Sequence, residues 1–147
     1  MAKYAGAVLG ATPVAAVANW VLEQVASKSG RIIEFSWGGE ATTSTAMRTR
    51  IAKDSAVGTG ARTAGNVQKT KTFAPANGVF FSTTYATTQP TISAGALWGT
   101  SWNAHGGVVR WLAAPGEEFE LVGAESIECR QDVGVGVSSY GLLWEED

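Results

Sequence analysis

The sequence is poor in the residues that most often carry out chemistry. Its 147 residues include one cysteine, Cys129, and one histidine, His105. A single cysteine cannot form a disulfide within the chain, and a single histidine cannot supply a histidine metal cluster. A Ser-His-acid triad would need His105 itself, which lies beside Gly106-Gly107 with no nucleophile motif around it. We therefore expect no catalytic residue, no metal and no cofactor, and we interpret the chain as not an enzyme.

Charge is also scarce, and it is nearly balanced. Charged residues make up 16% of the chain and the net charge is −2, which argues against a general affinity for nucleic acid or an anionic membrane. Residues 1–72 contain nine of the eleven Lys and Arg but four of the thirteen acids. Either the two halves pair within one domain and mix their charges, or the protein has two faces of opposite sign that dock identical copies side by side.

No apolar run crosses the length of a bilayer without interruption. The longest candidate, residues 5–22, is interrupted by Pro13 and Asn19. We interpret residues 1–18 as an extended N-terminal arm that precedes the first strand. The remainder, residues 19–147, has a length that suits one domain.

Two-residue alternation dominates the chain, and helical periodicity is weak. The clearest run, 31–37, places Ile33, Phe35 and Trp37 on one predicted strand face, and Gly38-Gly39 ends it. Gly and Pro pairs also interrupt the chain at 106–107 and 115–116. The pattern predicts an all-β protein, a single antiparallel sandwich or barrel. The other predicted strands are 19–26, 45–53, 67–73, 79–85, 92–98, 108–112, 119–121, 126–131 and 139–145.

The charged residues of these strands are expected on outer faces. In 126–131, Cys129 should point inward, and Glu128 and Arg130 should point to solvent. Glu118 and Glu120 share a strand face, which we interpret as an ordinary charged surface rather than the paired carboxylates of a glycosidase.

Three stretches resemble small proteins encoded among the structural genes of tailed bacteriophages. They are RIIEFSWGGEATTSTAMRTRIAK at 31–53, WNAHGGVVRWLAAPGEEFELVG at 102–123 and SYGLLWEE at 139–146. The resemblance implies a jelly-roll β-sandwich that acts as a capsid decoration, or cement, protein. Such a protein is made in the host cytoplasm, binds the outer surface of the virion capsid as a homotrimer and stabilises contacts between major capsid subunits. It implies no nucleic-acid, membrane or small-molecule partner.

Under this interpretation the N-terminal arm lies across a neighbouring subunit or the shell. The alternative is a carbohydrate- or receptor-binding β-sandwich of a phage tail or fibre, which needs exposed aromatic rings beside amides. Its predicted ligand-binding residues are Trp98, Trp102 and Asn103. For the capsid decoration protein, the predicted capsid or inter-subunit contacts are Lys3, Tyr4, Val8, Leu9, Arg48 and Arg50.

Overall fold

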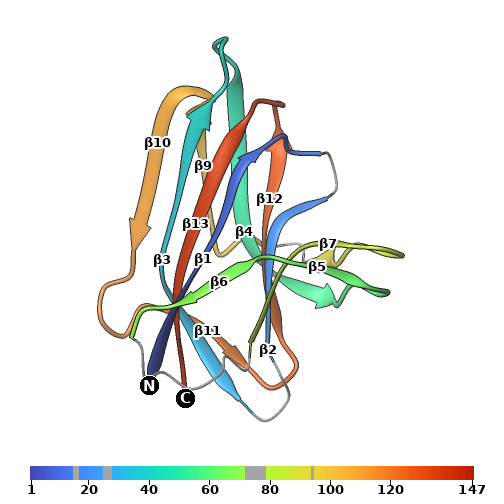
Figure 1. Ribbon diagram of the computed structural model, residues 1–147, viewed down its shortest axis with the longest axis vertical. Coiled ribbons are helices and arrows are strands. Elements are labelled where there is room, and N and C mark those ends of the chain that lie inside the picture. Colours follow the sequence, from blue (N-terminus) through green and yellow to red (C-terminus); the bar gives the residue numbers. More distant parts are fainter. Residues whose placement is uncertain (15–16, 25–27, 72–78, 94) are drawn as a thin grey trace.

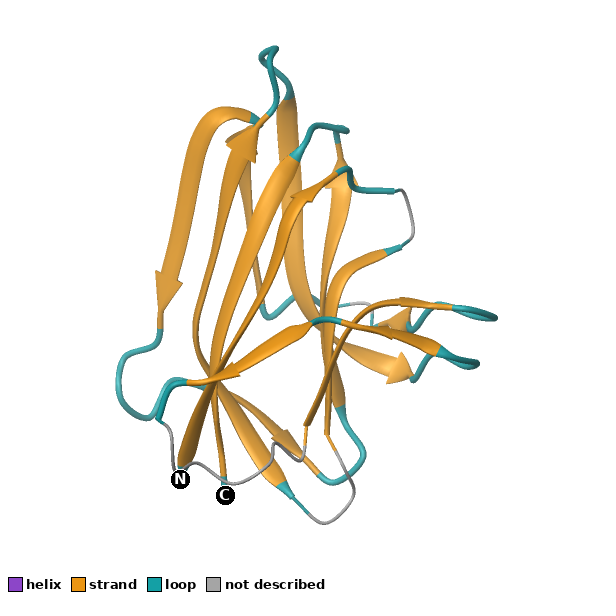
Figure 2. Ribbon diagram, viewed as in Figure 1, coloured by secondary structure: helices purple, strands orange, loops and turns teal. Residues whose placement is uncertain are grey.

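The computed structural model describes residues 1–14, 17–24, 28–71, 79–93 and 95–147. Within these ranges the chain forms strands and no helix (Figure 2). The strands are β1 (Ala2–Ala11), β2 (Ala18–Gln24), β3 (Ser29–Glu40), β4 (Ala46–Ala56), β5 (Arg62–Ala64), β6 (Asn66–Lys69), β7 (Val79–Tyr85), β8 (Thr91–Ile92), β9 (Trp98–Asn103), β10 (His105–Leu112), β11 (Phe119–Val122), β12 (Ser126–Val133) and β13 (Ser138–Glu146).

These strands form two antiparallel sheets that pack against each other (Figure 1). Sheet A has the order β10-β3-β13-β1-β6, and β11 also pairs with β3. Sheet B has the order β5-β7-β2-β12-β4-β8, and β9 also pairs with β4. The predicted all-β antiparallel sandwich is confirmed.

Strands that are far apart in the sequence pair in a nested order. The first strand, β1, pairs with the last, β13, and β2 pairs with β12. Further inward along the chain, β3 pairs with β10 and β11, and β4 pairs with β9. Successive pairs alternate between sheet A and sheet B. The two chain ends therefore lie side by side, with Ala2 opposite Glu146.

Aromatic side chains fill the space between the sheets. Trp20, Trp37 and Trp144 are each at most 2% exposed. Phe35 stacks on Trp37 and on Trp111, with ring centroids 5.3 and 4.8 Å apart. Stacked and edge-on rings bury large areas in defined geometries, so this cluster fixes how the two sheets face each other.

The prediction of an N-terminal arm is wrong. Most of residues 1–18 belong to β1, which lies inside sheet A between β13 and β6, and Ala18 begins β2; residues 15 and 16 lie outside the described residues. Tyr4 is fully buried, and its ring stacks on Trp144 at 5.9 Å. The core-facing position Gly6 has no side chain, and a Cβ there would sit 3.0 Å from the Phe81 ring. An inward position of a strand usually has an apolar side chain, and Gly6 has none. The alternation of apolar and polar residues that predicts a strand is therefore interrupted at this position.

The predicted faces of residues 31–37 are partly wrong. Ile32, rather than Ile33, is fully buried together with Phe35. The register between β13 and β3 shifts between Leu143 and Trp144, and this bulge exchanges the faces of β3 on either side of it. The strand also continues through Gly38-Gly39 instead of ending there.

Several predicted strand boundaries also change. The predicted strand 92–98 is two separate strands, β8 and β9, and β9 runs on to Asn103. The predicted strands 19–26 and 67–73 correspond to β2 and β6, and their residues 25–26 and 72–73 lie outside the described residues.

Candidate functional site

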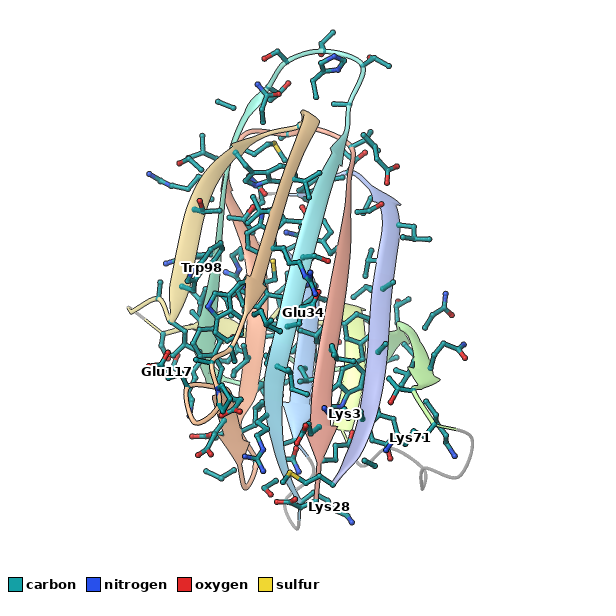
Figure 3. All side chains as sticks on the ribbon, turned by 90° about the vertical axis from the view of Figure 1, so that its left-hand side faces the viewer. Lys3, Lys28, Glu34, Lys71, Trp98 and Glu117 are labelled. Atoms are coloured by element: carbon teal, nitrogen blue, oxygen red, sulfur yellow. The ribbon has the colours of Figure 1, made fainter. Side chains whose placement is uncertain are left out.

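The outer face of sheet A is a broad exposed surface. Figure 3 looks onto it, with β10, β3, β13 and β1 side by side. Val108 and Leu112 of β10 are 79% and 59% exposed, and Arg110 between them forms two hydrogen bonds with Glu34 at 2.7 and 2.9 Å. The middle of the face has small residues, and a shallow groove there is lined by Ala5, Gly6, Glu34, Ser36, Gly141, Leu142 and Leu143. A flat β surface with few free charges suits contact with another protein.

A row of alternating charges crosses this face near the chain ends. Lys3 lies opposite Glu145, Glu145 lies opposite Arg31, and Arg31 lies opposite Glu120. The Lys3 ammonium is 3.1 Å from one Glu145 oxygen, and the Arg31 Nε is 3.7 Å from the other. Cross-strand pairs of opposite charge stabilise a sheet modestly. These pairs also show that basic residues of the first half do mix with acids of the second half.

The two edges of sheet A have opposite charges. Beside β11 at one edge, Glu117, Glu118 and Glu120 form an acidic cluster. At the other edge, β6 and the residues after it supply Lys69 and Lys71. Figure 3 shows Glu117 and Lys71 at opposite sides of the sheet. Within the described part of the chain, no salt bridge joins any of these five residues to another group.

The four predicted contacts in β1 divide between the two sides of the strand. Lys3 points outward, and Leu9 is 78% exposed. Tyr4 is fully buried in the core cluster, so the prediction that it makes an outside contact is wrong, and Val8 is partly buried against the same cluster. Alternation along β1 forces this division, because Tyr4 and Val8 follow the inward positions of the strand.

The predicted contacts Arg48 and Arg50 lie on β4 of the other sheet. Asp132 of β12 bridges the two, at 3.9 Å from the Arg48 Nε and 3.0 Å from the Arg50 Nε. Their side chains are 59% and 28% exposed. They therefore belong to the outer surface of sheet B and do not form one site with β1.

The residues predicted to bind a ligand do not form a platform. Trp98 packs edge-on against Phe35 and Trp37, with centroids 5.1 and 5.2 Å apart. Trp102 donates its indole N–H to the Thr49 hydroxyl at 2.9 Å. Asn103 is exposed. Its side-chain amide donates a hydrogen bond to the Ser44 hydroxyl and accepts one from the His105 backbone N–H. The two rings are partly buried against the core, and the amide stabilises the turn between β9 and β10.

A buried polar cluster on sheet B contradicts the prediction that Glu128 is solvated. Glu128 is fully buried, and its carboxylate lies 2.6 Å from the Arg130 Nε. Arg130 also donates to the Pro90 carbonyl at 2.9 Å, while Ser126 donates to Asp54 at 2.6 Å. Two-residue alternation identified the sheet side of Glu128 but could not show that Glu128 is buried against Arg130, which also bonds the segment around Pro90.

Burial shapes the ionisation of this cluster. Desolvation raises the pKa of Asp54 to about 7, opposed by the hydrogen bond from Ser126. Burial likewise raises the pKa of Glu128, and the Arg130 guanidinium opposes that change. The cluster joins β4 and β12 to the segment around Pro90 and so fastens that segment to sheet B.

Two further reactive side chains, Cys129 and His105, lie outside this cluster. Cys129 is fully buried, and burial raises the pKa of its thiol. His105 is exposed, and its Nδ1 lies 2.8 Å from the Ala41 carbonyl oxygen. Among the described residues no group of His, Cys, Asp and Glu is placed to hold a metal ion. The same ranges contain no helix long and apolar enough to span a membrane.

Comparisons with protein-family models, with curated proteins and with solved structures found no match to this chain.

Proposed function

We propose that this chain is a virion structural protein, a capsid decoration or cement protein of the jelly-roll type. In this proposal it binds the outside of a phage head as a homotrimer and stabilises the contacts between major capsid subunits. The sequence resemblance suggests this role, and the arrangement of strands supports it.

The observation that carries the proposal is the nested strand pairing. A jelly roll is a long antiparallel ribbon rolled into two sheets, so its outermost strand pair comes from the two chain ends and successive pairs alternate between sheets. The pairs β1–β13, β2–β12, β3–β10 and β4–β9 follow that order. The strands β5 to β8, which lie between β4 and β9 in the sequence, are an addition to this plan.

The physical properties of the sandwich suit a cement protein. Such a protein must resist the pressure of packed DNA and hold neighbouring capsomers, which needs rigidity and surface but no reaction. The aromatic core supplies rigidity, and the outer face of sheet A supplies an exposed area with Val108 and Leu112 at one edge. The packing of the partly buried Trp98 and Trp102 rings against the core favours this role over the carbohydrate-binding alternative.

The test is binding to heads that lack their decoration protein. We expect the purified chain to occupy repeated sites on such heads, seen as extra density by electron cryomicroscopy, and to raise the temperature at which they release DNA. The Leu9→Asp variant tests the remaining predicted apolar contact on β1, with Val135→Asp on the β12–β13 loop as its matched control. Absence from heads, together with binding to a glycan array, would favour the tail or fibre alternative.

A further inference from the structure

We infer that two copies of this chain associate through the outer faces of their A sheets, about a two-fold axis that runs along the strands between β13 and β3. The face is complementary to itself under this rotation, because unlike charges meet and large side chains meet small ones. The contact goes beyond the proposed function, since it is two-fold and a homotrimer is three-fold. On a head it would join copies from neighbouring trimers.

The middle of this face is open and hollowed. The shallow groove there is lined by residues of β1, β3 and β13, and Figure 3 shows Glu34 in the middle of the face. On β10, at one side of the groove, Val108 and Leu112 are 79% and 59% exposed. Two sheets pack face to face at about 10 Å, with the side chains of both faces between them. A second sheet can therefore pack on this face where its side chains match.

The charged row near the chain ends matches its own reverse. From β1 across the sheet to β11 it consists of Lys3, Glu145, Arg31 and Glu120, which lie opposite one another in register and alternate in sign. A rotation about an axis between β13 and β3 reverses this order and moves no residue along the strands. Lys3 then faces Glu120 of the second copy, and Glu145 faces Arg31 of the second copy. Every charge in the row meets an opposite charge.

Glu120 gains most from this arrangement. Lys3, Glu145 and Arg31 already form ion pairs within the chain, at 3.1 and 3.7 Å. Glu120 is exposed, and within the described residues no salt bridge joins it to another group. Lys3 of the second copy supplies the missing cation at this end of the row. Because the axis is two-fold, the same contact forms twice.

The same rotation places large side chains over small ones in the next two rows. Ala5 and Leu112 are the ends of one row across β1, β13, β3 and β10, and Ala7 and Arg110 are the ends of the next. Leu112 of the second copy therefore lies over Ala5, and Arg110 of the second copy lies over Ala7. The Arg110 guanidinium is bonded to Glu34 of its own copy at 2.7 and 2.9 Å, so covering it leaves no unpaired charge.

Charge selects this axis over a two-fold axis that crosses the strands. Such an axis lays each strand on the same strand of the second copy. If it passes through the charged row, like charges meet. If it passes further along the strands, the charged row meets uncharged residues such as Gly38, Ser139 and Val108, and its charges lose water without gaining partners. The axis along the strands avoids both costs, and a two-fold contact between identical surfaces is complete with two copies.

Charge reversal at the two ends of the row tests the contact. Lys3→Glu and Glu120→Lys each turn both Lys3–Glu120 contacts of a dimer into repulsions. An equal mixture of the two variants restores them, because one contact is then native and the other has its two charges exchanged. Arg48→Glu is the control, since Arg48 is a similarly exposed base with an acidic neighbour on the outer face of sheet B. The measurement is the molar mass by sedimentation equilibrium at low and high salt, with circular dichroism to verify folding.

We expect the wild type and the control to form dimers at low salt that dissociate as salt rises. Each charge variant alone should stay monomeric while folded, and the mixture should form dimers. A wild type that forms no dimer at any salt concentration overturns the inference, and so does a mixture of folded variants that stays monomeric.

A steric variant tests the same face without changing the charged row. Ala7 is exposed, so Ala7→Arg should fold and should fill the space that Arg110 of the second copy enters. We expect this variant to be monomeric, and dimers as stable as those of the wild type would overturn the inference. Binding to heads tests the proposed function separately. A wild type that forms dimers but leaves heads bare overturns the proposed function alone, and one that decorates heads but forms no dimer overturns this contact alone.

Discussion

At the scale of the residue, the contribution of a polar side chain to stability depends on whether it is buried. Most ion pairs, such as Lys3–Glu145 and Lys53–Glu125, are partly exposed and contribute little to stability. Glu128 differs because it is fully buried against Arg130. Removing one partner of such a pair leaves an uncompensated charge, so this cluster is the most sensitive polar part of the protein.

The first prediction concerns the pH dependence that Asp54 introduces. Its pKa is raised from 3.8 to about 7, with Glu128 and Arg130 facing it and Tyr85 within electrostatic reach. Between about pH 4 and pH 7 the folded protein therefore binds a proton that the unfolded chain does not. Stability should fall as pH rises through this window, and the Asp54 contribution should be constant above it.

The measurement is the free energy of unfolding in denaturant at a series of pH values, for the wild type and Asp54→Asn. The asparagine cannot ionise and can still accept the Ser126 hydrogen bond. We expect the variant to gain stability relative to the wild type as pH rises from 4 to 7. Two parallel curves across this range would show that Asp54 does not titrate there.

At the scale of the element, β1 shows that the start of the chain is part of the sandwich. It lies between β13 and β6, and it contributes Tyr4 to the core. Its small residues, including Gly6, let it pass close to Phe81 of sheet B. A strand in this position stabilises the sandwich and is not free to reach a neighbour.

The second prediction compares two residues of β1. Tyr4→Ala should cost about 3–5 kcal/mol of unfolding free energy, because it removes a buried aromatic ring. Leu9→Ala, on the same strand but 78% exposed, should change stability by less than about 0.5 kcal/mol. Chemical denaturation measures both. Equal and small effects would mean that the start of the chain is not part of the core.

The third prediction uses the adjacent glycines of β3. A Cβ on Gly39 would lie 2.1 Å from the Ala104 carbonyl oxygen, where the β9–β10 connection crosses close to the strand. A Cβ on Gly38 would have no atom within 4 Å. Gly39→Ala should therefore destabilise the protein by about 1–3 kcal/mol through overpacking. Gly38→Ala should be nearly neutral, and a thermal melt that ranks the two in the opposite order contradicts this packing.

At the scale of the whole molecule, nested pairing closes the chain on itself. The chain ends lie in one sheet, and Ala2 pairs with Glu146 next to it. Because many of the pairs join distant parts of the sequence, we expect slow and cooperative folding. Because the two ends already lie next to each other, we expect folding to depend on the order of the strands around this closed chain and less on where the chain begins.

The fourth prediction tests this closure by circular permutation. Joining residue 147 to residue 1 by a short Gly/Ser linker and opening the chain between Thr42 and Thr43, in the exposed loop between β3 and β4, should give a folded protein. Its melting temperature should stay within a few degrees of the wild type. Opening the chain inside β13, between Leu142 and Leu143, is the control and should prevent folding.

The sequence by itself determined the class of fold. Alternation in 31–37, 79–85 and 139–145, interrupted by glycine and proline, is a local property of each strand, so it identifies strands without their partners. The sequence also established that the chain has one cysteine and one histidine, because composition does not depend on folding. Alternation failed where glycine replaced a side chain, as at Gly6 in β1, and where a bulge exchanged the faces of β3.

Only the tertiary structure decided which strands pair and what covers them. The burial of Glu128 involves Arg130, which bonds the distant Pro90 carbonyl, and the partial burial of Trp98 depends on Phe35 and Trp37 across the core. The placing of three glutamates and two lysines at opposite edges of one sheet also follows from the strand order. These are relations between residues far apart in the chain, and the periodicity of a single strand contains no information about its neighbours.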